Sequence, residues 1–460
     1  MSQFDLAVVN GVLVDESGSR LADLGIRDGV VAVVAEQGGL SGADRTLDAN
    51  RMWILPGFVD AHFHCRAPDH PEREDFASGT MAAAAGGVTT VLEMPVADVG
   101  VTTVRRFGAR QALAEAACYV DFGLFAGCGS LSEAEVLGLA EAGAIGFKVF
   151  THSPLPARRP AFEGLWLTEN SELLRAMQMV NRTGLTCAFH AEDESLLRMY
   201  DEGSRDLPDS ADRYAISRPA VVEAMAVARI CVLAEACGAR VHIVHVSSRW
   251  ALDEVRAAQA RGVRVTAETC PHYMFFTEDN FRQVGRAAKV APPLRTLDDT
   301  QALVEGVADG TLDIICSDHA PFTPADREDV GMMAAPSGLP SAEIFAQLAL
   351  DAALRGHLDV VQVVRALTAG PARVYGLFPH KGTLTAGADG DFVVYNPGAW
   401  TTIETATWFT RSRDSAALFE GRALQGQVTH TFVRGRPVFV DGKVVGRAGW
   451  GRMVSRAREG

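Results

Sequence analysis

The sequence lacks several features that would mark a secreted or membrane-bound protein. Its first residues, Met-Ser-Gln-Phe-Asp-Leu, contain neither the positively charged region nor the apolar region of a secretory signal peptide. No apolar run approaches the roughly 20 residues that a membrane-spanning helix needs. We therefore expect a cytoplasmic protein with no membrane partner.

Positive charge is also scarce. The chain has 43 Lys and Arg against 57 Asp and Glu, a net charge of −14 at pH 7, and no long basic run, so we expect no nucleic-acid partner. The eight cysteines include no Cys-x-x-Cys pair, which is typical of reduced, buried thiols rather than of a disulfide or zinc framework. The absence of a G-x-G-x-x-G motif after the first strand of the central stretch argues against a dinucleotide site.

The 460 residues divide into three consecutive stretches that differ in their pattern of apolar and polar side chains. Residues 1–53 alternate apolar and polar side chains and contain Asn10-Gly11 and Asp28-Gly29, dipeptides that are typical of β-hairpins. Residues 54–380 alternate short apolar runs with Ala- and Leu-rich amphipathic stretches, and residues 381–460 return to the first pattern. Because a small sheet has too little core to stand alone, we expect the two ends of the chain to form one small β-sandwich domain.

The central stretch contains eight apolar runs of strand length. They are residues 54–64, 88–94, 119–126, 145–151, 185–190, 240–246, 263–269 and 312–318. The amphipathic stretches between them predict helices, clearest at residues 105–117, 132–142, 169–183, 219–237 and 249–261. Strands that alternate with helices in this way favour an α/β fold with a closed (β/α)8 barrel of the TIM type, rather than an open doubly wound sheet.

Two histidines, His62 and His64, end the first of these strands. Because side chains on a strand alternate between its faces, both imidazoles must point the same way. Neutral imidazole is the commonest metal ligand, so the pair is a good half-site for a divalent ion. The same pair could equally lie on the polar face of an edge strand. Further ligands at the ends of other strands would favour the metal site over this alternative.

Such ligands are present. In a parallel barrel the functional groups collect at the C-terminal ends of the strands, where this sequence places Lys148, His190, His245 and Asp318. Lys148 stands in an apolar strand, where burial lowers the pKa of its amine. A neutral amine can add CO2, and the resulting carbamate is an anion whose two oxygens could bridge two ions.

A binuclear metal site can be assembled from these residues. We predict that the two histidines of the first strand and Asp318 hold one ion, that His190 and His245 hold the other, and that carboxylated Lys148 bridges them. Such a pair of ions lowers the pKa of a bridging water and polarises a carbonyl oxygen. Asp318 is then placed to act as the catalytic base that passes a proton to a leaving nitrogen. This chemistry suits the hydrolysis of an amide or ester, most simply a ring amide.

The remaining histidines are weaker candidates. His272 follows the seventh strand at the same barrel end and could contact substrate or a metal-bound water. We expect His242 to face away from His245 and to pack in the interior, and His319 to orient its neighbours. Four others have no apparent partner and are expected at the surface: His152, His357, His380 and His430.

The residues named so far lie in motifs that resemble the cyclic amidohydrolases, the hydantoinase/dihydropyrimidinase, allantoinase and dihydroorotase family of the amidohydrolase superfamily. The resemblance covers nearly the whole chain. Its most specific motifs are Pro-Gly-Phe-Val-Asp-Ala-His-Phe-His at 56–64, Gly-Phe-Lys-Val-Phe at 146–150, Glu-Thr-Cys-Pro-His-Tyr at 268–273 and Ser-Asp-His-Ala-Pro at 317–321. The resemblance implies two zinc ions, a carboxylated Lys148, Asp318 as the base, and a homotetramer or homodimer.

The branch of the family stays open. Arg66 resembles the arginine with which dihydroorotases bind a substrate carboxylate, but Val96 replaces the asparagine expected after Met94-Pro95. The motif at 268–273 and Lys-Val-Ala-Pro-Pro at 289–293 are most similar to those of allantoinases and L-hydantoinases.

We expect a small cyclic amide or ureide as the substrate, of the hydantoin or allantoin type. Ala291 and Ser337 match positions where the family contacts the ring amide through main-chain atoms, and the loop at residues 151–167 is expected to cover the pocket and to select the ring substituent. The alternatives are a dihydroorotase or other cyclic imide or amide hydrolase, and a non-catalytic scaffold with this fold.

Overall fold

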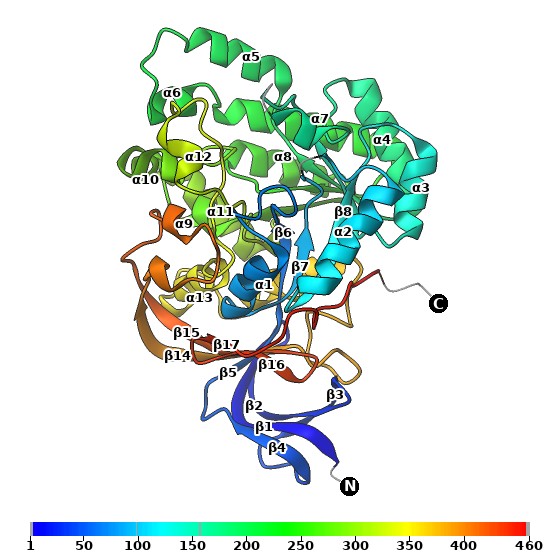
Figure 1. The fold of residues 1–460 in the computed structure, drawn as a ribbon, viewed down its shortest axis with the longest axis vertical. Helices are drawn as coiled ribbons and strands as arrows, with labels where there is room; N and C mark the ends of the chain where they lie inside the picture. The colour runs from blue at the N-terminus through cyan, green and yellow to red at the C-terminus, as the bar shows by residue number, and fades with distance from the viewer. Residues whose placement is uncertain (1–2, 98, 156–157, 457–460) are drawn as a thin grey trace.

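Eight parallel strands form the centre of the computed structural model, which describes residues 3–97, 99–155 and 158–456 (Figure 1). Neighbouring strands pair in the order of the sequence: β6 (Phe58–Phe63), β7 (Val88–Glu93), β8 (Asp121–Gly127), β9 (Gly146–Phe150), β10 (Thr186–His190), β11 (Val241–Ile243), β12 (Val265–Thr269) and β13 (Ile314–Ile315). A bridge between Phe63 and His319 brings the first strand against the segment that follows the last. The predicted TIM-type barrel is confirmed, although its last strand is very short.

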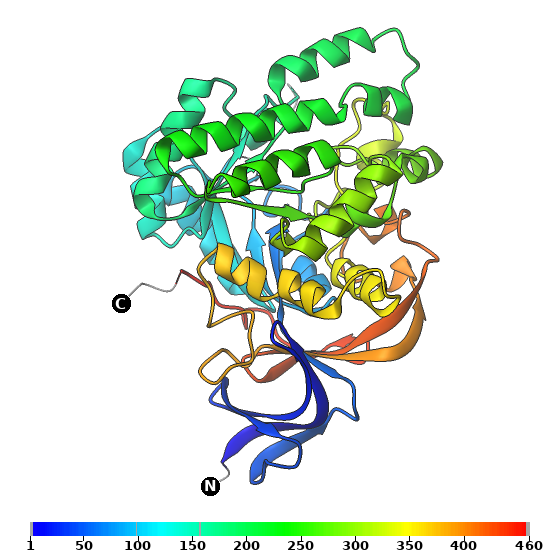
Figure 2. The ribbon, with the colours of Figure 1, turned by 180° about the vertical axis from the view of Figure 1, so that it is seen from behind.

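Helices surround this barrel on the outside (Figure 2). They are α1 (Phe76–Ala85), α2 (Val104–Ala117), α3 (Glu133–Glu141), α4 (Asn170–Thr183), α7 (Ala220–Cys237), α8 (Arg249–Ala260), α11 (Leu297–Asp309), α13 (Phe345–Leu354), α14 (Val360–Leu367) and α15 (Ala369–Val374). Further helices lie in the connections: α5 (Glu194–Gly203), α6 (Ala211–Ile216), α9 (Pro271–Phe275), α10 (Glu278–Val284) and α12 (Ala325–Glu328). Local signals set their ends: the Thr103 side chain caps α2, and α4 stops at Gly184, whose φ is 71°.

The first predicted strand is in fact two strands. Residues 53–56 form β5 (Trp53–Pro56), which pairs with a strand from the other end of the chain, and β6 begins the barrel after Gly57. A Cβ atom at Gly57 would collide with the Thr89 side chain, so this crossing point requires glycine. One short segment therefore joins the terminal sheet directly to β6, which contains His62 and is followed at once by His64.

The terminal strands form one continuous sheet of nine strands, seen at the bottom of Figure 1. Besides β5 they are β1 (Phe4–Asp15), β2 (Gly18–Arg27), β3 (Val30–Glu36), β4 (Ala43–Asp48), β14 (Phe392–Thr402), β15 (Ala423–Val433), β16 (Arg436–Val440) and β17 (Lys443–Val444). β14 pairs antiparallel with β5, so both chain ends contribute to it. The prediction that the termini build a separate β-domain is confirmed; the limits at residues 53 and 381 stay a prediction.

One hairpin prediction is wrong. Asp28-Gly29 does form the turn between β2 and β3, but Asn10-Gly11 lies inside β1, at a bulge where the pairing with β2 shifts. Asn10 has a positive φ of 58°, which permits the bulge. The Asp23 carboxylate accepts the N–H of Asn10 at 3.0 Å and so stabilises it.

None of the helices in the described part of the chain is long and apolar enough to span a membrane.

Candidate active site

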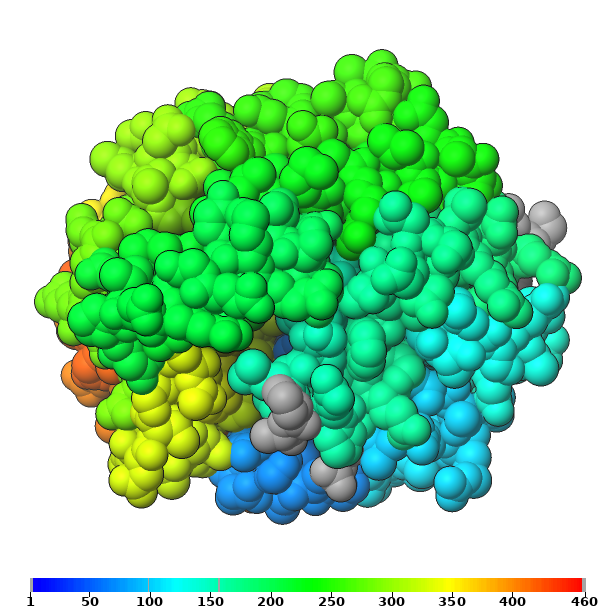
Figure 3. Space-filling model, turned by 90° about the horizontal axis from the view of Figure 1, so that it is seen from above, coloured from blue at the N-terminus to red at the C-terminus, as the bar shows by residue number. Residues whose placement is uncertain are grey.

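A cavity of about 680 Å3 opens at the C-terminal end of the barrel strands. Figure 3 looks down on this face and shows a hollow between the teal segment after β9 and the yellow segment around α12. All six side chains that the sequence analysis proposed as ligands line it: His62, His64, Lys148, His190, His245 and Asp318. The barrel therefore brings together groups that are widely separated along the chain.

His62, in β6, and His64, directly after it, face Asp318. Nε2 of His62 and Nε2 of His64 lie 3.4 Å and 3.6 Å from the same oxygen of Asp318, Oδ1. On the other side of the ring, Nδ1 of His62 is 2.5 Å from Oε1 of the fully buried Glu268. A carboxylate there accepts the Nδ1 proton, so the Nε2 lone pair of His62 is directed into the cavity.

The other two histidines form a second pair. Nδ1 of His190 lies 2.9 Å from Nε2 of His245, while Nε2 of His190 lies 2.7 Å from Oε2 of Glu192. Burial raises the pKa of Glu192, but the charge of Arg218 at 2.6 Å and the His190 hydrogen bond outweigh it and hold that pKa below its ordinary value. Burial lowers the pKa of His190 to about 3, which leaves it neutral and able to bind a metal.

Lys148 lies between the two groups. Its side chain is fully buried, and its Nζ has no hydrogen-bond partner among the described residues. Burial lowers its pKa to about 8, against the opposing charges of Glu268 and Asp318.

The site fits metal ions held by these donors. Besides Nζ of Lys148, the buried Nδ1 atoms of His64 and His245 have no partner among the described residues. Buried polar atoms are normally satisfied, so several orphaned donors around one cavity indicate a group that binds there. His62, His64 and Asp318 also place their ligand atoms close enough together to share one ion.

The backbone is strained at two of these residues. Asp318 has a φ of 44° and His245 a φ of 39°, in the left-handed region that non-glycine residues rarely occupy. Neighbouring hydrogen bonds hold the Asp318 turn: Ser317 donates its N–H to Oδ1 of Asp60 at 3.0 Å, and Ser341 donates its hydroxyl to the Ser317 carbonyl at 2.7 Å. Because this network is buried, it can stabilise a conformation that the local sequence disfavours.

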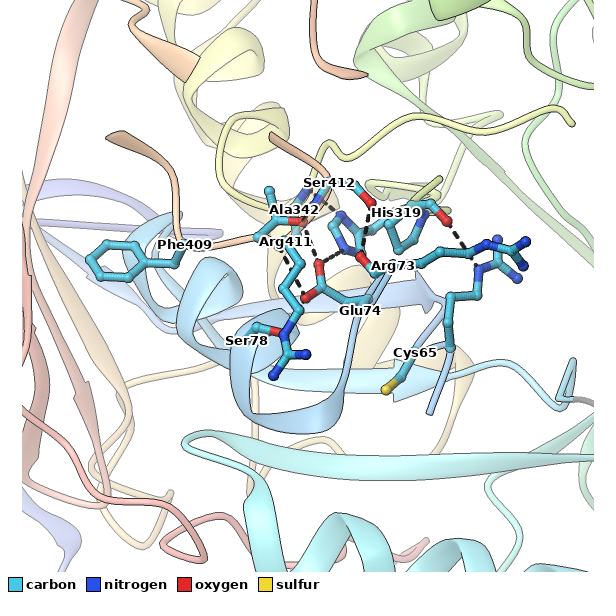
Figure 4. A network of polar contacts seen from close by, with 12 residues as sticks. Cys65, Arg73, Glu74, Ser78, His319, Ala342, Phe409, Arg411 and Ser412 are labelled. Atoms are coloured by element: carbon cyan, nitrogen blue, oxygen red, sulfur yellow. Dashed lines mark hydrogen bonds and ion pairs between the residues drawn. The ribbon is translucent and has the colours of Figure 1, made fainter. Parts of the chain in front are cut away.

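His319 belongs to a second buried network (Figure 4). Its Nδ1 accepts the N–H of Ala342 at 3.2 Å, so its Nε2 carries the proton that points to Oε2 of Glu74 at 3.1 Å. The His319 carbonyl accepts the N–H of His64 at 2.8 Å. Glu74 also accepts hydrogen bonds from the side chains of Ser78 and Thr410. The C-terminal segment thereby contacts the residues that support the site.

Sequence reasoning missed several supporting residues. Glu268 was noticed only as part of a motif, yet it binds His62, and its Oε2 lies 3.1 Å from Nε2 of His242. His242 is thus an interior hydrogen-bonding group rather than a simple packing residue. The signal in both cases is an ionisable residue inside an apolar strand. His152 was expected at the surface and is not there: it lines the cavity, its ring 5.0 Å from that of His190.

The proposed substrate contacts are placed as follows. Arg66, Ala291 and Ser337 line the cavity, whereas His272 is buried and is not among the described residues that line it. Oγ of Ser337 lies 3.3 Å from the Tyr214 hydroxyl. The loop at residues 151–167 does form one side of the cavity; its residues 156 and 157 lie outside the described part of the chain.

The chain is similar to known proteins over almost its whole length. The sequence matches the model of the Amidohydrolase family over residues 53–438. It is 36% identical to an allantoinase of Rubrobacter xylanophilus, with 100% of this chain and 99% of that protein covered. It is 32% identical to a D-hydantoinase of Streptomyces coelicolor, with 97% of each covered. Among solved structures, the L-hydantoinase (dihydropyrimidinase) of Arthrobacter aurescens superposes with a TM-score of 0.93 at 29% identity, covering 99% of this chain and 100% of that one.

Proposed function

The chain belongs to the amidohydrolase family and is a hydrolase of cyclic amides, and we propose that its substrate is a ring ureide of the hydantoin or allantoin type. The observation that carries the proposal is the convergence of four histidines, one aspartate and one unpartnered buried lysine at the barrel end. Full-length similarity to both an allantoinase and a D-hydantoinase supports this choice of ring.

We further propose that these six residues hold two zinc ions. His62, His64 and Asp318 would bind one ion, and His190 and His245 the other. Lys148, carboxylated on Nζ, would bridge them, which would satisfy the orphaned amine. Bound ions would lower the pKa of a water at the site and polarise the ring carbonyl.

The protein's own residues then handle the proton. Asp318 accepts one proton from the attacking water as the carbon–oxygen bond forms. The same residue delivers that proton to the ring nitrogen as the ring carbon–nitrogen bond breaks, which frees an amide or urea group. The second proton of the water leaves to solvent when the new carboxylic acid ionises to a carboxylate. Glu268 and Glu192 keep His62 and His190 in the tautomers that leave the cavity-facing nitrogens unprotonated.

The test is ring opening by the purified protein, loaded with zinc in bicarbonate buffer. The panel is allantoin, hydantoin, 5-substituted hydantoins, dihydrouracil, dihydroorotate and a cyclic imide, with chelator-treated protein as the control. Metal-dependent opening of allantoin or a hydantoin is the expected result. Turnover of dihydroorotate alone would move the protein to the dihydroorotases, and a protein that neither binds metal nor opens any ring would be a scaffold.

We also propose a homo-oligomer in the cytoplasm. Met225 and Val232 on α7 and Trp250 on α8 each expose more than half of their surface, a pattern that suits a subunit contact. The eight cysteines are free, and all except Cys237 are buried, as suits a reducing compartment. Light scattering of the native protein and of a Val232→Glu variant tests the contact. A charge at an apolar interface should dissociate the oligomer, so the measured molar mass of the variant should be lower.

A further inference from the structure

A second cavity, of about 720 Å3, lies beside the terminal sheet, which is at the bottom of Figure 1. Its lining residues belong to β1, β2, β4, β16, the turns next to β2 and β16, and the segment after β17, and none of the described ones also lines the cavity at the barrel end. Five of them are arginines: Arg45, Arg434, Arg436, Arg447 and Arg452. Because acidic residues outnumber basic ones by 57 to 43 in the whole chain, this concentration of positive charge is a local exception. We call this site the basic cavity.

Carboxylates neutralise little of the charge in the basic cavity. Asp5 and Asp28 also line it, but Asp28 lies 3.8 Å from Arg27, which is outside the lining. Arg434 pairs with Asp121. The other four arginines are exposed, and no ion pair involves them in the part of the chain that the structure describes. Four cations are therefore available to an anion that enters the cavity.

Arg434 is the buried member of the set, with only 9% of its side chain exposed. Besides its ion pair with Asp121, it donates a hydrogen bond from Nη2 to the Trp450 carbonyl at 2.6 Å. Its Nε has no hydrogen-bond partner among the described residues. Buried donors of charged groups are normally satisfied, so the free Nε–H indicates an acceptor that binds in the basic cavity.

The indole ring of Trp450 arranges three of the arginines. The Cζ atoms of Arg434, Arg436 and Arg447 lie 4.7, 4.8 and 5.9 Å from the centroid of this ring. A guanidinium beside an aromatic ring gains free energy from the cation–π interaction, and its N–H groups still can donate in its own plane. Donors that are already arranged lose less conformational entropy when a ligand binds.

We propose that the basic cavity binds a small phosphorylated molecule whose phosphate groups carry at least two negative charges. A guanidinium can donate two parallel hydrogen bonds to a phosphate, and a tetrahedral phosphate can accept them from several directions at once. The cavity volume lies in the range of small-molecule sites. Two sources share this chemistry, inorganic pyrophosphate and the phosphate chain of a nucleotide.

A ligand in the basic cavity would connect two parts of the molecule. Arg45 belongs to β4 of the terminal sheet, whereas Arg452 belongs to the C-terminal segment. The main-chain N–H of Arg452 donates to Oδ1 of Asp121, the first residue of the barrel strand β8, at 2.8 Å. Because an anion shared by both arginines favours the folded protein, its binding should raise the melting temperature.

Calorimetric titration of the full-length protein tests the site, with pyrophosphate, ADP and citrate, a tricarboxylate of similar charge, as the probes. We expect pyrophosphate or ADP to bind one to one, more tightly than citrate, and to raise Tm. Tighter binding of ADP would assign the nucleotide as the source, and equal or tighter binding of pyrophosphate would assign the inorganic anion. Citrate that binds as tightly as the phosphates, or the absence of binding by either phosphate compound, would overturn the proposal.

A double variant, Arg436→Met with Arg452→Met, locates the binding. Both side chains are exposed and outside any ion pair in the described ranges, so circular dichroism should report an intact fold. The loss of two charged donors should weaken pyrophosphate binding at least about tenfold.

The matched control is Arg51→Met with Arg105→Met, which removes the same charge at two exposed positions that do not line the basic cavity. This control should keep the native affinity. Native affinity in the Arg436 and Arg452 double variant would place the anion elsewhere, the candidate active site included, and would overturn the proposal. Because binding is measured without turnover, the result does not depend on the proposed function.

Discussion

The carboxylate of Glu74 holds the imidazole of His319, with 3.1 Å between Oε2 and Nε2. His319 directly follows Asp318, and its carbonyl accepts the N–H of His64. Glu74 is fully buried and also receives hydrogen bonds from the C-terminal segment around Thr410. Glu74 is not among the described residues that line the cavity, yet through His319 it supports the strained turn that contains Asp318, the proposed base.

Replacing Glu74 tests this support. Glu74→Gln should lower kcat about tenfold with little change in KM, and should lower the free energy of unfolding by about 1–3 kcal/mol, because the amide cannot satisfy all of the donors that face it. Steady-state kinetics and urea unfolding measure the two effects. Glu72→Gln, at a solvent-exposed position nearby, is the control and should change neither. Native kinetics in Glu74→Gln would contradict the positioning role.

The bridging role of Lys148 predicts a change in metal content. Lys148→Ala should bind less than the two zinc ions per chain proposed for the native protein, because the bridging anion is missing, and should have no measurable turnover. Elemental analysis and activity assays check this, and short carboxylic acids should restore part of the activity by replacing the carbamate. Full metal occupancy in the variant would refute the bridging role.

Asp318 has a separate prediction, since its proposed catalytic part is proton transfer. Asp318→Asn keeps the shape of the side chain but removes the base, so kcat should fall about 10²- to 10⁴-fold. Circular dichroism should report an intact fold. Unchanged turnover would eliminate Asp318 as the base, whereas a scaffold would show no turnover in either protein.

Glu268 should control metal affinity through His62. Glu268→Gln removes the charged acceptor at 2.5 Å from Nδ1, so His62 can adopt the other tautomer and direct a proton into the cavity. We expect zinc affinity to fall about 10- to 100-fold, measured by competition with a chromogenic chelator. Glu254→Gln, an isosteric change on the outer helix α8, provides the comparison. Equal affinities in the two variants would mean that Glu268 does not orient the ligand.

A buried lysine predicts how stability depends on pH. Nζ of Lys381 lies 2.5 Å, 2.8 Å and 2.6 Å from carboxylate oxygens of Asp121, Asp389 and Asp391, between the barrel and the terminal sheet. Burial lowers the pKa of Lys381, but Asp391 and Asp121 outweigh it and raise that pKa above its ordinary value. The stabilisation should therefore be complete below about pH 10, the pKa of an unfolded lysine, and should decline at higher pH.

Lys381→Met tests this dependence, because it removes the cation that the three carboxylates share and leaves only Arg434, which pairs with Asp121. The variant should lose about 3–5 kcal/mol of unfolding free energy at pH 8. The difference from the native protein should shrink as the pH rises beyond about 10. Urea unfolding at several pH values measures it, with the exposed Lys443→Met as the control. A difference that grows with pH would contradict the assigned sign.

Much of the barrel could be predicted from the sequence because its signals are local. The five helices expected between strands are all present, and the alternation of side chains along a strand was enough to place His62 and His64 on one face. The strand ends could then be searched for ligands, since parallel strands in a barrel end at the same rim. Local patterns misled where a distant partner decided the outcome, as at Asn10-Gly11, where pairing with β2 and the Asp23 carboxylate replaced the hairpin by a bulge.

The sequence by itself thus determined the fold class and the six candidate ligands, because periodicity and strand order are properties of the chain read in one dimension. Only the tertiary structure decided which carboxylates orient the histidines, that the first strand divides at Gly57 between two sheets, and that five arginines line one cavity beside the terminal sheet. Those relationships join residues from distant segments through distances and charges in space. Burial and electrostatic compensation act between neighbours in three dimensions, and no spacing along the chain encodes them.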